Sequence, residues 1–302
     1  MQSCNVCGNR LTECFPEVRD PLTGEIFAIE RCAECGLGHT VPQPSNLGRY
    51  YASRYYGNRH GFTARFCSTR RMRFVAASAG RGEGKSLLDI GCGDGAFLLE
   101  ARQSGWNVTG TELNPAMARE AGLDVREDIA LIGGEGKFHC ITMWHTLEHM
   151  RDIPSMLGHA ARLLSPEGRL IVAVPDWGGL QARIFGPRWL HLDVPRHLYH
   201  FDAGALRRSL ETAGFAPERE WHQEFEYDLL GFSQSALNYL MPHPNVFFDA
   251  LTGKGGGHGR IATTAGLVQG SLLTVLSLPL LAAGTLSGRG GTLIAVVKKT
   301  VK

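Results

Sequence analysis

The chain carries almost no excess charge of either sign, and its first residues lack a long apolar run. Thirty-one Lys and Arg oppose 29 Asp and Glu, so the net charge is only +2. That balance favours no polyanionic partner, and we expect no nucleic acid ligand. Basic residues do cluster on a helix-compatible stretch, where a solvated face is the simplest interpretation: Arg65, Arg70, Arg71 and Arg73. The opening segment MQSCNVCGNR has no apolar signal region, which predicts a cytoplasmic protein.

The eight cysteines do not form the pattern of a small disulfide-bonded domain. Four of them form two C-x-x-C pairs 24 residues apart, each followed by glycine: Cys4, Cys7, Cys32 and Cys35. Four thiolates complete a tetrahedral shell with no open position, which predicts a structural zinc ribbon built around a hairpin. A redox pair or free thiols are the alternatives, and His39 is a further potential ligand. The remaining cysteines are predicted to be small buried residues: Cys14, Cys67, Cys92 and Cys140.

The stretch SLLDIGCGDGAFL, residues 86–98, is typical of a buried strand, a tight turn and the start of a helix. Gly91, Gly93 and Gly95 allow positive φ and let a ligand approach the backbone. The free N–H groups of the helix start point back at the same turn. Glycine turns also close ordinary α/β connections, so this pattern alone is a weak signal.

A second apolar run, WNVTGTEL at residues 106–113, ends in Glu112. In a doubly wound sheet the end of the second strand lies beside the first glycine turn. A carboxylate there can accept two hydrogen bonds from a ribose diol. Together the turn and Glu112 predict a cofactor that carries a nucleoside.

These residues resemble a known family. LLDIGCGDG followed by TGTEL is similar to motifs I and II of class I S-adenosylmethionine (SAM) dependent methyltransferases, rather than to the G-x-G-x-x-G of NAD enzymes. The similarity continues in TMWHTLEHMRD, LLSPEGRLIVAVPD and LDVPRHLYHF, over about residues 1–225 and again 290–300. The chain resembles the branch that often carries an N-terminal cysteine-rich module. One departure is His139, where the family usually has Asp.

The resemblance implies an α/β fold: a Rossmann-like doubly wound seven-stranded sheet with an antiparallel last strand, plus the zinc ribbon. It implies SAM as the cofactor. Residues expected to contact or orient SAM are Asp89, Gly91, Gly93, Gly95, Glu112 and Asp128, the last beside the adenine amine. His197 is the first candidate for the general base, followed by His149 and Tyr199. Glu148 either faces the pocket mouth or caps or charges the start of the next helix.

Length and composition fit one large domain plus a small appendage. The expected parts are a zinc ribbon at 1–41, a linker and helix at 42–83, a SAM-binding core at 84–225, an apolar insertion at 226–290 and a last strand with tail at 291–302. Residues 177–201 form a long connection rich in aromatics and histidines, which is typical of a substrate lid. Four tyrosines either line the pocket or pack the ribbon against the main domain: Tyr50, Tyr51, Tyr55 and Tyr56.

The insertion contains a glycine loop at 253–260 and then 28 residues, 261–288, without a charged side chain. This length suffices to cross a bilayer, but glycines, a proline and hydroxyl residues dilute it. If 291–297 rejoins the sheet, a single crossing would leave that strand on the wrong side. Three alternatives stay open: contact with a membrane surface or lipid substrate, a buried helix or oligomer interface, and a true span.

The sequence therefore predicts SAM-dependent methyl transfer to a hydroxyl or carbon of a small-molecule or sugar acceptor, with a lipid-linked acceptor favoured by the insertion. The expected location is the cytoplasm, including the inner face of the membrane. The alternative from another class is a non-catalytic scaffold that kept the SAM fold and docks a partner through its ribbon. An NAD-dependent oxidoreductase is disfavoured by the glycine spacing.

Overall fold

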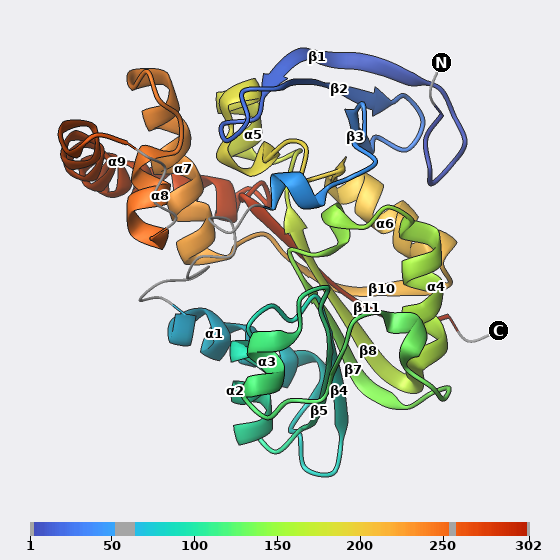
Figure 1. The fold of residues 1–302 in the computed structure, drawn as a ribbon. Helices are drawn as coiled ribbons and strands as arrows, with labels where there is room; N and C mark the ends of the chain where they lie inside the picture. The colour runs from blue at the N-terminus through green and yellow to red at the C-terminus, as the bar shows by residue number, and fades with distance from the viewer. Residues whose placement is uncertain (1–2, 52–63, 254–257, 301–302) are drawn as a thin grey trace. The chain divides into compact units, whose positions relative to one another are not determined.

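The computed structural model describes residues 3–51, 64–253 and 258–300, and Figure 1 shows its elements. The chain forms two compact units. The first, here called the sheet unit, comprises the described residues of 62–174, 206–220 and 294–302. The second, here called the ribbon unit, comprises those of 1–61, 175–205 and 221–293. Tyr55 and Tyr56, predicted to line the pocket or pack the ribbon, lie outside the described residues.

A seven-stranded sheet organises the sheet unit, with the order β10-β11-β8-β7-β4-β5-β6. Strands β6, β5, β4, β7 and β8 run parallel, and β11 is antiparallel. This confirms the predicted fold class. The strands are β4 (Ser86–Ile90), β5 (Asn107–Thr111), β6 (Val125–Arg126), β7 (Phe138–Trp144), β8 (Leu164–Pro175), β10 (Phe215–Trp221) and β11 (Thr292–Lys299).

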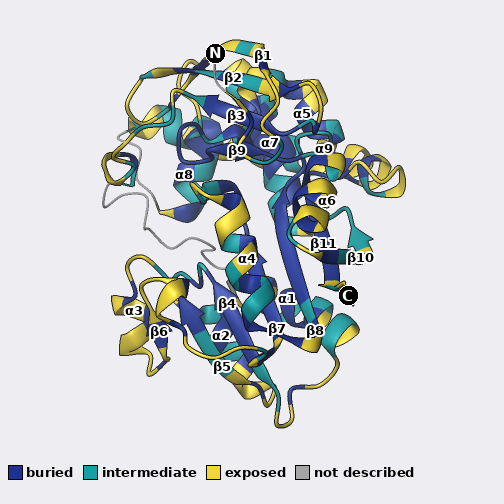
Figure 2. Cartoon of the chain, turned by 90° about the vertical axis from the view of Figure 1, so that its right-hand side faces the viewer, coloured by how far each residue is buried: buried dark blue, intermediate teal, exposed yellow. Residues whose placement is uncertain are grey.

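Helices cover both faces of this sheet, as Figure 1 shows for α1, α2 and α3 on one side and α4 on the other. Strands β7 and β8 between them are almost wholly buried, dark blue in Figure 2. Parallel strands covered on both faces form a continuous apolar core. The helices are α1 (Ala64–Ala79), α2 (Ala96–Gln103), α3 (Ala116–Glu120), α4 (Ile153–Leu163) and α6 (Ala203–Thr212).

Several local expectations are wrong. Residues 123–129 are predicted from the sequence to form the third strand, but only Val125–Arg126 do so. The Asn-Pro pair at 114–115 predicts a helix with Pro115 as its first residue, whereas α3 begins one residue later, at Ala116. Asp152, not Glu148, caps α4 by accepting from the Ser155 N–H. Arg71 is buried against Trp144 rather than solvated, with its guanidinium 5.2 Å from the ring centroid.

The ribbon unit contains a four-stranded antiparallel sheet in the order β1-β2-β3-β9. Its strands are β1 (Leu11–Arg19), β2 (Ile26–Cys32), β3 (Gly38–Val41) and β9 (Tyr199–His200). The predicted hairpin at 18–31 is present. Cys14 is exposed, contrary to prediction, because the β1–β2 register shifts between Glu13 and Phe15. The fourth strand comes from the predicted lid segment, 177–201, where no strand is predicted.

The insertion at 226–290 is helical. It forms α7 (Phe225–Leu240), α8 (Val246–Thr252) and α9 (Arg260–Leu286), while the short α5 (Leu180–Phe185) belongs to the preceding connection. Figure 1 shows α7, α8 and α9 side by side. By length and composition α9 suffices to cross a membrane. The predicted glycine loop falls mostly on 254–257, outside the described residues.

Candidate functional site

The glycine turn between β4 and α2 has the geometry that its sequence predicts. Gly91, Gly93 and Gly95 all have positive φ, at 77°, 58° and 84°. A Cβ on Gly91 would lie 2.5 Å from the Thr146 side chain, so that position admits only glycine. The Gly91 and Cys92 N–H groups donate to the Thr111 carbonyl, at 2.8 and 3.0 Å. The turn is therefore held against the end of β5.

Glu112 lies at this turn, as predicted from its place at the end of the second strand. Its Oε2 accepts a hydrogen bond from the Gly93 N–H at 2.9 Å. The backbone of Glu112 is fixed in turn by donating to the Arg126 carbonyl of β6. A carboxylate thus stands next to a glycine backbone at the carboxyl edge of an open sheet, where ligands of such folds bind. Contact of Glu112 with a ribose diol stays a prediction.

Asp89 lies on β4, just before the glycine turn. It is buried on β4, and its Oδ1 accepts from the Thr142 hydroxyl of β7 at 2.7 Å. Burial raises the pKa of Asp89 to about 7, although the Thr142 hydrogen bond opposes that shift. The Asp89 side chain therefore links β4 to β7 next to the glycine turn.

Asp128 is exposed at the start of a short 3-10 turn, residues Ile129–Leu131. Its Oδ1 accepts from the Ala130 N–H at 2.8 Å. The residue follows β6, so it stands at the same edge of the sheet as Glu112. Contact with an adenine amine stays a prediction for it.

The segment after β7 contains the predicted candidate base His149, together with two residues that the sequence alone does not single out, His145 and Thr146. His145 is buried and has a left-handed backbone, φ 51°, which is strained for a residue that is not glycine. Thr146 packs on Gly91. His149, the last residue of the 3-10 turn Leu147–His149, is half-buried and donates its backbone N–H to the Thr146 carbonyl. His149 is thus anchored one short turn from the glycines.

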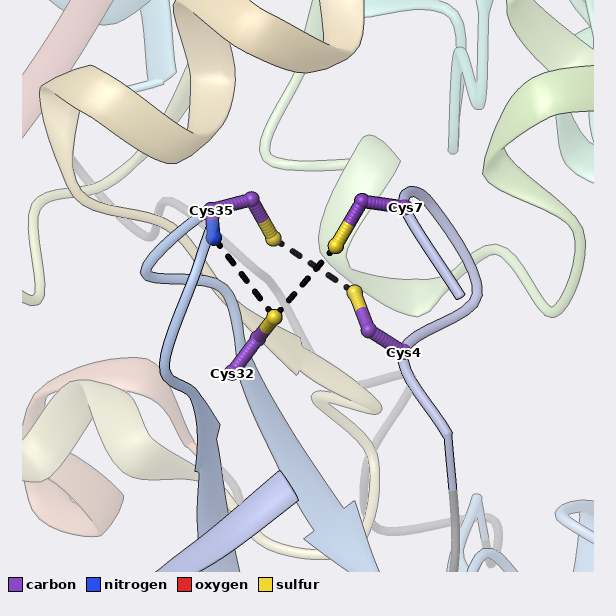
Figure 3. Close-up of side chains that lie close together, drawn as sticks. All are labelled: Cys4, Cys7, Cys32 and Cys35. Carbon is purple, nitrogen blue, oxygen red and sulfur yellow. Dashed lines mark hydrogen bonds between the residues drawn. The ribbon is translucent and has the colours of Figure 1, made fainter. Parts of the chain in front are cut away.

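The four predicted metal ligands come together in the ribbon unit (Figure 3). Cys4 and Cys35 place their sulfurs 3.4 Å apart, as do Cys7 and Cys32, and all four sulfurs lie within 4.8 Å of one another. A zinc ion about 2.3 Å from each sulfur would hold neighbouring sulfurs about 3.8 Å apart. The cluster therefore fits a tetrahedral Cys4-type site.

The thiols differ in how readily they ionise. Burial opposes ionisation of Cys7, but hydrogen bonds from Asn9 and the neighbouring thiols lower its pKa to about 7. Burial raises the pKa of Cys4 and Cys35. His39 does not complete the shell: it is buried, its ring stands edge-on to Tyr199, and burial lowers its pKa to about 4.

The PRHLYHF segment, residues 195–201, is tied to the ribbon sheet through its side chains. The Arg196 guanidinium donates to Asp20 Oδ1 at 2.8 Å and to Asp193 Oδ1 at 2.7 Å. Tyr199 is buried, and its hydroxyl accepts a hydrogen bond from Asn5, inside the first C-x-x-C pair. His200 Nε2 lies 3.0 Å from the Thr40 hydroxyl. This segment, which is part of the similarity to the methyltransferases, is therefore attached to the cysteine-rich module.

His197, the first candidate base, is buried. Its Nδ1 lies 2.9 Å from the His191 carbonyl, so that nitrogen carries the proton. Burial lowers the pKa of His197 to about 3, which makes a neutral but weak base. His149 is more exposed and belongs to the sheet unit with the glycine turn.

An open parallel sheet with this glycine turn, and a carboxylate at the end of the next strand, defines a nucleoside-cofactor-binding α/β protein. The family described as "Methyltransferase domain" matches residues 59–220. The chain therefore belongs to this family and is a SAM-dependent methyltransferase.

Three proteins illustrate the similarity. Demethylmenaquinone methyltransferase of Thermus thermophilus is 29% identical over 189 residues, which cover 51% of this chain and 81% of that protein. Nocamycin O-methyltransferase of Saccharothrix syringae is 28% identical, over 47% and 63%. Phosphoethanolamine N-methyltransferase 2 of Haemonchus contortus, solved with S-adenosyl-L-methionine, shares the fold with a TM-score of 0.56 at 15% identity, over 87% of this chain and 62% of that one.

Proposed function

We propose that this methyltransferase binds SAM at the turn 91–95 and transfers its methyl group to a hydroxyl oxygen of a small acceptor. The proposal depends on the hydrogen bond from the Gly93 N–H to Glu112. This bond places a carboxylate that can accept hydrogen bonds from the ribose diol next to the backbone of the glycine turn. Relatives named as ubiquinone and nocamycin O-methyltransferases support an oxygen acceptor. A sugar or a lipid-linked hydroxyl is the acceptor class that we favour.

The chain's residues have two tasks in this reaction. The methyl group of a sulfonium is already electrophilic, so the protein has to align the acceptor oxygen with it and remove the hydroxyl proton. His149 is the best placed of the three candidate bases, since it is half-buried and anchored to Thr146 beside the glycine turn. In this proposal His197 and Tyr199 have a structural role: their hydrogen bonds hold residues 195–201 in place.

We also propose a structural zinc ion at the four cysteines, supported by their sulfur spacing. A closed four-thiolate shell leaves zinc no open position for a substrate. The metal would therefore hold the ribbon in shape and take no part in methyl transfer. For the location we propose the cytoplasm, with peripheral contact at the inner face of the membrane.

The acceptor is tested by incubating the full chain with methyl-labelled SAM and separate pools of phenols and quinols, nucleotide sugars, and membrane lipid extracts. We expect label in a hydroxyl-bearing component, with the largest incorporation from the lipid extract. Label in soluble quinols alone would refute a lipid-linked acceptor but would still support methyl transfer to oxygen. SAM binding without transfer to any pool would favour the scaffold alternative.

A further inference from the structure

Helix α9 has an inverted distribution of side chains. Its outward face consists of large aliphatic residues that are more than half exposed: Ile261, Val268, Leu272, Val275, Leu276 and Leu286. A helix on the surface of a protein in water normally presents polar residues outward. An exposed aliphatic stripe of this length marks an interaction surface.

Four of the five buried residues of α9 are small, and the fifth is Leu281. Gly266 and Gly270 pack so closely on α8 that a Cβ would lie 2.6 Å from Val246 and 2.3 Å from Phe247. Ser277 and Gly284 are buried further along the same helix. Small residues inward and large aliphatic residues outward is the pattern of helices that face lipid. The packing therefore favours lipid over water outside α9.

The charged residues that flank α9 in the sequence are basic. No Asp or Glu occurs after Asp249 in the sequence, whereas six Lys and Arg do. Arg260 begins the helix and Arg289 follows its end, and both are exposed. Basic residues that flank an apolar helix face are attracted to anionic lipid headgroups. A second copy of α9 would bring no opposite charge to pair with them.

The contacts of α9 argue against a full crossing of the bilayer. Leu281 is buried in the apolar cluster that includes Phe185 and Phe232. The Arg289 N–H donates to the Gly284 carbonyl, and the Arg289 carbonyl accepts from the Leu180 N–H. The neighbouring helix α7 buries polar side chains, among them Asp228, which do not suit a lipid core. A helix held in this way lies along a membrane rather than through it.

We propose that the outward face of α9 docks the protein on an anionic lipid bilayer, with its aliphatic side chains in the interfacial region and Arg260 and Arg289 at the headgroups. The helix buried in the protein's own core, one alternative left open by the sequence, does not occur in the described chain, because most of α9 is exposed. This surface does not depend on the identity of the methyl acceptor.

Vesicle flotation tests the proposal with the full chain. We expect wild-type protein to float with equimolar phosphatidylcholine and phosphatidylglycerol vesicles, and less with phosphatidylcholine alone. The double variant Leu272→Glu, Val275→Glu should reduce binding at least about tenfold, since two aliphatic anchors are lost. Leu131→Glu is the matched control: Leu131 is similarly exposed, at 66%, but lies in the sheet unit, and it should float like wild type.

Two further readouts keep the outcome decisive. Thermal unfolding followed by circular dichroism shows whether the double variant is folded, because it reports on the ribbon unit that contains α9 as well as on the sheet unit. Light scattering without lipid measures the oligomeric state. Equal flotation of wild type and folded double variant would overturn the proposal. The proposal would also be overturned if the wild type were a dimer, the double variant a monomer, and neither bound vesicles. The outward face of α9 would then contact a second copy of the chain.

Discussion

At the scale of single residues, the left-handed backbone of His145 positions the short turn at Leu147–His149. A non-glycine residue at φ 51° costs free energy that the surrounding structure has to supply, here helped by its N–H bond to the Ala173 carbonyl. The bend directs the chain into the turn that ends at His149. The strained backbone of His145 therefore helps to position the candidate base His149 beside the glycine turn.

His149 gives the first prediction at this scale. Replacing His149 with Ala should lower kcat by about a hundredfold, the usual contribution of a general base, while leaving the Kd for SAM unchanged. His159→Ala serves as control, because that histidine is likewise half-buried but lies on α4. The measurement is steady-state methyl transfer together with calorimetry. If His197→Ala removed activity and His149→Ala did not, the base would be His197, as the sequence favours.

At the scale of elements, β9 joins two segments that are far apart in the chain. It pairs with β3, and the Thr40 N–H and hydroxyl bond to the Leu198 and His197 carbonyls. The Asn5 bond to Tyr199 connects the same segment to the first cysteine pair. A metal that holds the cysteines should therefore also hold residues 195–201 in place.

Zinc removal tests this coupling. The purified chain should contain about one zinc ion, and stripping it should accelerate tryptic cleavage after Arg196 by about tenfold or more, because that buried residue becomes accessible. Cleavage after Arg102, which lies in the sheet unit, should not change. Mass spectrometry of the digests gives both rates. Unchanged cleavage after Arg196 would show that the metal does not order this segment.

The sequence anticipates elements whose signal is local. The cysteine spacing, the glycine turn and the acidic end of β5 each depend on neighbouring residues, and the structure brings each together as expected. β9 is different, because a two-residue strand has no periodicity and its partner Gly38–Val41 lies about 160 residues earlier. The inverted face of α9 is also hidden in the sequence, which shows an apolar run but not which side packs against α8.

At the scale of the whole molecule, the predicted cofactor residues all belong to the sheet unit, and the predicted metal ligands all belong to the ribbon unit. The candidate bases divide between them, with His149 in the first and His197 and Tyr199 in the second. The predicted cofactor site and the proposed membrane-docking face therefore lie in different units of the chain. SAM binding therefore reports on the folding of the sheet unit, and variants altered in α9 also need a thermal unfolding measurement.

The identification of the turn 91–95, with Glu112, as the SAM site can be checked by isothermal titration of SAM into the full chain. Glu112→Ala is the variant, and Glu127→Ala is the control, since Glu127 is exposed and pairs with Arg119. We predict saturable binding to wild type and control, weakened at least about tenfold in Glu112→Ala, because charge-assisted hydrogen bonds are lost. No binding to wild type, or equal affinity for all three proteins, would show that the cofactor site lies elsewhere or is absent.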